Sequence, residues 1–107
     1  MLVQELKSLM DSSKEWGKNE VLIDVREPDE FAQGRVPHAI NTPLDNLSSK
    51  LHLIENYGAI YVICKAGGRS ASACEALTRI FGPKKKIINI EGGTLAWERA
   101  GFPISQG

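Results

Sequence analysis

The amino-acid sequence predicts an α/β domain with a mainly parallel sheet of four to five strands and helices on both faces. Two observations carry this prediction. Short apolar runs of strand length alternate along the chain with segments whose apolar residues recur every three or four positions. The clearest runs, residues 21–25 and 60–63, are almost continuously apolar, which is typical of parallel strands covered on both faces. Strands that alternate with helices are joined by right-handed crossovers in one layered domain.

The length of the chain limits the number of domains, and its net charge limits the kinds of partner. The 107 residues suit one hydrophobic core, so we expect a single domain over residues 1–107. The 13 basic and 13 acidic residues balance, which leaves no broad positive field for nucleic acid or an anionic membrane. No apolar segment approaches the ~20 residues of a membrane span, and no secretion signal opens the chain. We therefore expect a cytoplasmic protein without nucleic-acid or membrane partners.

Five elements are predicted in the first half of the chain. Apolar residues at helical spacing predict a helix over residues 2–10, and residues 21–25 form the first strand. Residues 28–34 predict a short helix, because a proline and two acidic residues open it. Residues 39–41 are expected to form a very short strand. A further helix over residues 44–54 carries an apolar stripe until a glycine stops the pattern.

Four elements are predicted in the second half. Residues 60–63 form a strand that leads into a glycine-rich loop, and a helix follows with Ser70 or Ser72 as its N-cap. Residues 87–90 predict the last strand, and residues 94–100 a short closing helix.

The most informative segment is the loop between the strand and the helix of this second half. Cys64 stands at the end of the predicted strand, and Gly67 and Gly68 permit the positive φ angles that aim several amides at one point. Such amides, with those of a helix N-terminus, form a concave site for negative charge. This environment, with Lys65 and Arg69 nearby, should lower the pKa of the thiol below its usual ~8.5. The segment therefore predicts a nucleophilic thiolate.

The same segment resembles the active-site loop of the rhodanese family. Single-domain sulfurtransferases of this family carry Cys-x-x-Gly-x-Arg-Ser, matched here by Cys64, Gly67, Arg69 and Ser70. Three further blocks resemble family blocks in the same order: residues 22–31, residues 34–41, and residues 91–103. Together they extend from about Val21 to Pro103, so the resemblance implies a rhodanese-like fold over most of the chain.

The resemblance also implies a mechanism. A rhodanese thiolate takes the outer sulfur of a donor such as thiosulfate, holds it as a persulfide, and passes it to cyanide or a thiol. Here it implies Cys64 as the nucleophile and Arg69 as a second catalytic residue. The surrounding loop would bind the substrate and the persulfide through Lys65, Ala66, Gly67, Gly68 and Ser70. The partners would be a small sulfur donor, thiosulfate or a persulfide, and a thiol, cyanide or possibly an acceptor protein. No cofactor and no metal are implied.

We also expect specific contacts or conformations for several neighbouring residues. Asp24 is expected to support the loop by hydrogen bonding to its backbone, and Arg69 to bind either an oxyanion of the donor or loop carbonyls. Arg26 and Glu30 are expected to pair with each other. His38 stands where the family usually has glycine, so a retained positive φ would cost about 1 kcal/mol.

Alternatives to this reading remain open on the sequence. A sulfur-relay carrier for a partner protein would use the same residues. A phosphatase or arsenate reductase of related type places five residues between its cysteine and arginine, whereas four separate Cys64 from Arg69. A non-catalytic binding module would lose the cysteine. Cys64 could also be a small core residue at the end of its strand. Cys74 lies on the apolar side of the following helix, and core packing is the role we expect for it.

Overall fold

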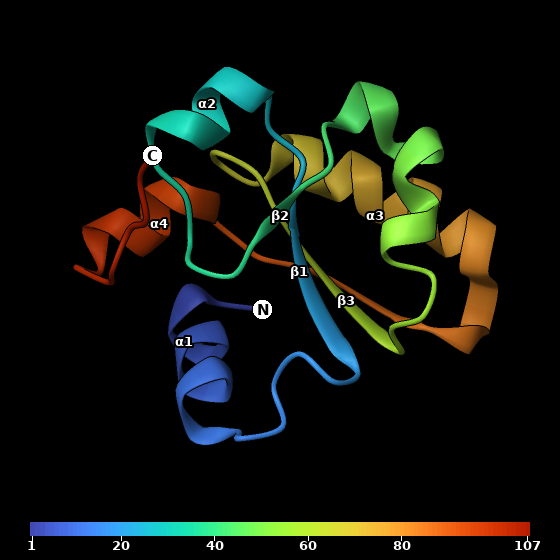
Figure 1. The fold of residues 1–107 in the computed structure, drawn as a ribbon, viewed down its shortest axis with the longest axis horizontal. Helices are drawn as coiled ribbons and strands as arrows, with labels where there is room; N and C mark the ends of the chain where they lie inside the picture. Colours follow the sequence, from blue (N-terminus) through green and yellow to red (C-terminus); the bar gives the residue numbers. More distant parts are fainter.

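The computed structural model describes residues 1–107, and a four-stranded parallel sheet forms its centre (Figure 1). The strands lie in the order β2-β1-β3-β4, and each neighbouring pair is parallel. The predicted parallel α/β sheet is therefore confirmed, with four strands. Their bounds are β1 (Glu20–Asp24), β2 (Ile40–Asn41), β3 (Ala59–Ile63) and β4 (Lys86–Asn89).

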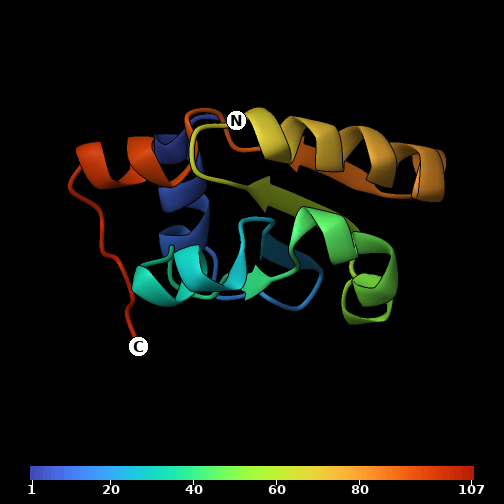
Figure 2. The ribbon, with the colours of Figure 1, turned by 90° about the horizontal axis from the view of Figure 1, so that it is seen from above.

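Helices cover both faces of this sheet. Helices α1 and α4 lie on one side of the strands, and α3 and the 3₁₀-helix η1 lie on the other (Figures 1 and 2). Helix α2 follows the carboxyl end of β1, and a single 3₁₀ turn, η2, precedes β4. Their bounds are α1 (Val3–Ser12), α2 (Pro28–Gln33), η1 (Leu44–Leu53), α3 (Gly68–Phe81), η2 (Gly82–Lys84) and α4 (Gly93–Arg99).

The core consists of two apolar clusters, one on each face of the sheet. Successive side chains of a strand point to opposite faces, so Ile60 and Val62 enter one cluster while Tyr61 and Ile63 enter the other. All five residues of β3 are buried, as expected for a central strand. This double burial explains the continuous apolar runs of the sequence.

Two elements differ in detail from their predictions. Helix α3 begins at Gly68, and its N-cap is Gly67 with φ 111°, so neither Ser70 nor Ser72 caps the helix. The η1 segment winds as a 3₁₀-helix rather than an α-helix. Apolar residues three apart share a face in both helix types, so the sequence pattern does not separate them.

The histidines lie on the surface, as expected. His38 has φ 72°, which confirms that the positive angle of the usual glycine is retained. Its side chain and that of His52 are exposed. None of the helices has the length and apolar character needed to cross a membrane.

Candidate active site

The carboxyl edge of the sheet gathers three polar groups at the ends of neighbouring strands. Asp24 ends β1, Cys64 directly follows β3, and Asn89 ends β4. In open parallel sheets this edge is where ligands bind. Cys64 is only 1% exposed, so its sulfur lies at the floor of the loop rather than at the open surface.

The loop after β3 directs hydrogen-bond donors at the sulfur. The backbone N–H of Gly67 donates to Sγ of Cys64 at 3.0 Å, and Oγ of Ser70 lies 3.3 Å from Sγ. A neutral thiol donates to this hydroxyl, whereas a thiolate accepts from it. Oγ of Ser70 also lies 2.5 Å from Oδ1 of Asn89, so the hydroxyl connects the cysteine to the end of β4. Of the loop amides, that of Gly67 forms the hydrogen bond to Sγ.

The pKa of Cys64 reflects two opposing influences. Burial of the thiol raises the pKa, but the hydroxyl of Ser70 and the backbone N–H groups of Ser70, Gly67 and Ala66 stabilise the thiolate. The net effect is a pKa below the ordinary value, in spite of the burial. The loop therefore favours the nucleophilic form of the cysteine.

The turn between β4 and α4, with the start of α4, supports the loop between β3 and α3, which we call the cysteine loop (residues 64–67). The backbone N–H and the hydroxyl of Thr94 donate to the carbonyl oxygen of Cys64 at 2.9 and 3.1 Å, and the N–H of Leu95 donates to that of Lys65 at 3.1 Å. Gly93, with φ 59°, allows this approach. A Cβ at this position would collide with the carbonyl oxygen of Cys64 and lie 2.5 Å from that of Lys65.

Arg69 is held by a carboxylate from another element. Its guanidinium donates to both carboxylate oxygens of Glu30 on α2, at 2.6 and 2.9 Å. Hydrogen bonding from Arg69 lowers the pKa of Glu30 to about 2, against the smaller opposing effect of burial. Bonding from Glu30 likewise raises the pKa of Arg69. The partner of Arg69 is thus Glu30 rather than a loop carbonyl, which was one of its two expected partners; the other, an oxyanion of the donor, stays a prediction.

Asp24 and Arg26 form a separate, buried ion pair. Nε of Arg26 donates to Oδ1 of Asp24 at 3.0 Å, Nη2 donates to Oδ2 at 2.8 Å, and Nη2 also reaches the carbonyl of Gly34 at 2.7 Å. The expected Arg26–Glu30 pair and the expected bonding of Asp24 to the cysteine loop are therefore wrong. The carboxylates of Asp24 and Glu30 have partners other than the expected ones, because each pairing depends on which elements lie side by side in the fold. Asp24 positions Arg26 and the segment after α2.

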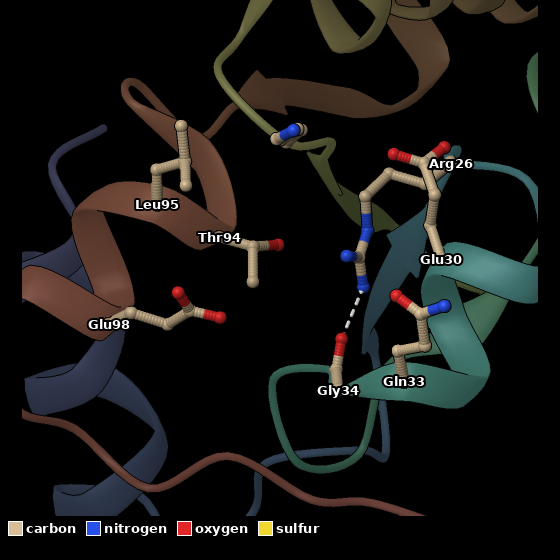
Figure 3. Close-up of a pocket in the computed structure, with 8 residues that line it drawn as sticks. Arg26, Glu30, Gln33, Gly34, Thr94, Leu95 and Glu98 are labelled. Carbon is tan, nitrogen blue, oxygen red and sulfur yellow. Dashed lines mark hydrogen bonds between the residues drawn. The ribbon is translucent and has the colours of Figure 1, made fainter.

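The largest cavity of the molecule adjoins the cysteine loop (Figure 3). It has a volume of about 310 Å³ and lies between α2, α4 and Lys65. Seven of its eight lining residues are polar, charged or glycine, and the eighth is Leu95. Figure 3 shows the side chain of Glu98 extending into this space from α4, opposite the guanidinium of Arg26.

The second cysteine has a different environment. Cys74 lies on α3 and packs against the core cluster on that face of the sheet, in agreement with the predicted packing role. Burial raises the pKa of Cys74 to about 11. The pKa of Cys64 thus lies below its ordinary value and that of Cys74 above it, so Cys64 is the more readily ionised of the two thiols.

Three contributors to the site were not assigned to it from the sequence: Asn89, Thr94 and the Glu30 partner of Arg69. Asn89 interrupts the apolar run at the end of β4, and a polar residue at a strand's carboxyl end was the available signal. For Thr94 the sequence predicts only a place at the start of a short helix. Its contact with the cysteine loop joins residues 30 positions apart, which no local pattern encodes.

Comparison with known proteins identifies the same fold. The model of the rhodanese-like domain matches residues 2–100. A sulfurtransferase of Allochromatium vinosum is 34% identical over 85 residues, covering 78% of this chain and 77% of its own. Thiosulfate sulfurtransferase 18 of Arabidopsis thaliana is 32% identical over 120 residues, covering 96% of this chain and 80% of its own.

A solved structure gives the same result. The crystal structure of a rhodanese-related protein from Thermoplasma volcanium superposes with a TM-score of 0.83 at 30% identity, covering 100% of this chain and 97% of that one. The molecule is thus an α/β domain with a buried cysteine of lowered pKa at the carboxyl edge of a parallel sheet. The chain belongs to the rhodanese family, and its sulfurtransferase relatives support sulfurtransferase activity in general.

Proposed function

We propose that this protein is a sulfurtransferase that moves a sulfane sulfur from thiosulfate or a persulfide donor to a thiol or cyanide through a persulfide on Cys64. One observation carries the proposal. The Sγ atom of Cys64 accepts a hydrogen bond from the N–H of Gly67 at 3.0 Å and lies 3.3 Å from the Ser70 hydroxyl, and its pKa is lowered although the side chain is buried. A site that stabilises negative charge on sulfur suits both the attacking thiolate and the persulfide anion.

The first half-reaction forms a bond between Sγ of Cys64 and the outer sulfur of thiosulfate. The sulfur–sulfur bond of thiosulfate breaks, and its electron pair leaves with sulfite. Lys65, exposed beside the nucleophile, attracts the dianionic donor. Arg69, held by Glu30, positions the loop and presents positive charge near the sulfur.

In the second half-reaction, cyanide or a thiolate attacks the outer sulfur. The bond to Sγ breaks, and its electron pair restores the Cys64 thiolate. The loop amides and the Ser70 hydroxyl stabilise the charge on sulfur between the two steps. The four-residue spacing between Cys64 and Arg69 gives a small loop, which suits a single sulfur better than a phosphoryl group.

Intact-mass measurement after incubation with thiosulfate tests the proposal. We expect one added sulfur on the wild-type protein and on Cys74→Ser, and none on Cys64→Ser. Thiocyanate formation from thiosulfate and cyanide should follow the same pattern, with Cys64→Ser inactive. Equal sulfur loading of wild type and Cys64→Ser would overturn the proposal, because the transfer would then use another group.

A further inference from the structure

The cavity beside the cysteine loop is lined by four charged side chains, two of which have partners. Arg26 is paired with Asp24, and Glu30 is paired with Arg69. The remaining two, Lys65 and Glu98, form no ion pair and no side-chain hydrogen bond, with each other or with any other residue. The cavity thus presents one free cation and one free anion.

These two free charges come from different elements. Lys65 belongs to the cysteine loop, directly after the nucleophile, and Glu98 projects from α4 into the cavity (Figure 3). The hydroxyl of Thr94 and the side chain of Gln33 add neutral polar groups to the same lining. The volume of about 310 Å³ lies at the small end of the ~300–1,000 Å³ range of ligand pockets, which suits a molecule of amino-acid size.

From this charge pattern we propose that the cavity binds the acceptor of the second half-reaction as a zwitterionic thiol of the cysteine type. Lys65 binds the carboxylate of the acceptor, and Glu98 binds its ammonium group. Glu98 is then a specificity-determining residue of the transfer. This inference rests on the proposed function, because it concerns the step that empties the Cys64 persulfide.

In the second half-reaction the acceptor occupies this cavity. Once sulfite has left, Lys65 is free to bind the carboxylate of an acceptor. The acceptor thiolate attacks the outer sulfur, a new sulfur–sulfur bond forms, and the bond to Sγ breaks with its electron pair on Cys64. The acceptor leaves as a persulfide. In the persulfide the outer sulfur is bonded to Sγ at ~2.05 Å, and it is this outer atom that the acceptor thiolate attacks.

Four thiols that differ in their charges test the inference: cysteine, cysteamine, 3-mercaptopropionate and 2-mercaptoethanol. Each is given as acceptor to protein already loaded from thiosulfate, and kcat/KM is expressed per thiolate to remove differences in thiol acidity. For the wild type we expect cysteine to be the best acceptor and 2-mercaptoethanol the poorest. Each matched charge should contribute about two- to fivefold, as exposed ion pairs do.

Variants of Glu98 and Lys65 test which residue recognises each charged group of the acceptor. Glu98→Gln should lower the ratio of cysteine to 3-mercaptopropionate about two- to fivefold, because these thiols differ in the ammonium group. Lys65→Gln should instead lower the ratio of 3-mercaptopropionate to 2-mercaptoethanol by a similar factor. Glu55→Gln removes an exposed carboxylate outside the cavity and should leave both ratios unchanged.

The outcomes separate this inference from the proposed function. Sulfur loading of Cys64 with acceptor ratios that do not respond to Glu98→Gln or Lys65→Gln overturns the inference and leaves the sulfurtransferase intact. Absence of any added sulfur on Cys64 after thiosulfate treatment overturns both the proposed function and this inference.

Discussion

Two turns at the same edge of the sheet use similar backbone geometry for different purposes. The β3–α3 loop and the β4–α4 turn both lead from a strand to a helix, and both helices have a left-handed glycine as N-cap, Gly67 with φ 111° and Gly92 with φ 77°. In the first loop the N–H of Gly67 donates to the Cys64 sulfur, whereas after the second turn the N–H groups of Thr94 and Leu95, at the start of α4, donate to carbonyl groups of the first loop. Similar turns thus divide into a reactive loop and a support.

The largest effect should come from a substitution at Gly93, where the β4–α4 turn meets and supports the reactive loop. Gly93→Ala places a Cβ against the carbonyl groups of Cys64 and Lys65, at a residue with φ 59°. Left-handed strain and overpacking together should lower the free energy of unfolding by about 3 kcal/mol. Urea unfolding measures this change, and sulfur loading should fall with it.

A matched glycine in the reactive loop serves as the control for Gly93→Ala. Gly68 has no positive φ, and a Cβ there meets no atom within 4 Å. Gly68→Ala should therefore raise the free energy of unfolding by about 0.4–1 kcal/mol. Equal unfolding midpoints for the two variants would show that the second turn does not support the first.

The next effect concerns the reactive loop and the acidity of its thiol. The Ser70 hydroxyl helps to lower the pKa of Cys64, so in Ser70→Ala this pKa should move upward. The thiolate fraction at neutral pH then decreases, and alkylation of Cys64 by iodoacetamide at pH 7 should slow severalfold. The rate measured from pH 5 to pH 10 should show its midpoint at higher pH than in the wild type.

Ser72→Ala is the control on the same helix. Ser72 is exposed and has no side-chain hydrogen bond, so its removal should leave the alkylation profile unchanged. Superimposable profiles of Ser70→Ala and the wild type would mean that the hydroxyl does not stabilise the thiolate. Cys74, with a pKa of about 11, should stay unmodified at pH 7 in every variant.

The smallest effect should come from the ion pair that holds Arg69. The pKa of Glu30 is depressed to about 2 in the folded state against 4.5 as a reference, so its contribution to stability is present above pH 4.5 and disappears as the pH falls toward 2. Both side chains are about one third exposed, which limits the contribution to ~1 kcal/mol or less. Glu30→Gln should therefore be less stable than the wild type at pH 6 by this amount.

Urea unfolding of wild type and Glu30→Gln at pH 6, 4 and 2 checks the sign of this effect. The difference between them should shrink as the pH falls. Glu75 is an exposed carboxylate on α3 without an ion pair, so the free energy of unfolding of Glu75→Gln should differ little from that of the wild type at any of these pH values. A gap between wild type and Glu30→Gln that widens toward pH 2 would contradict the assigned ion pair.

The sequence predicted the reactive loop better than its support. Cys64, Gly67, Arg69 and Ser70 lie within seven positions, so local spacing shows their relation directly. The sheet and its covering helices were also predictable, because apolar periodicity reports burial on one or both faces. The predicted serine N-cap of α3 is wrong, because Gly67, with φ 111°, occupies the cap position.

The contacts that the sequence did not predict join distant elements. Glu30 meets Arg69 across 39 positions, and Thr94 meets Cys64 across 30. Arg26 was assigned to Glu30 because they are neighbours in the sequence, but the fold places its guanidinium on Asp24 and Gly34. Such pairings follow from the packing of α2 and α4 around the sheet edge, which no spacing rule contains.

The short outer strands have a consequence for the behaviour of the protein in concentrated solution. An unpaired strand edge can recruit another chain and start aggregation. Here one outer strand, β2, has only two residues, and the other, β4, has four and begins with the exposed Lys86. The side chain of Asn41 turns back to donate to the carbonyl groups of Asp24 and Arg26 rather than outward. Copies of this domain therefore find little backbone to extend a sheet between them, and crowding should not readily convert it into fibres.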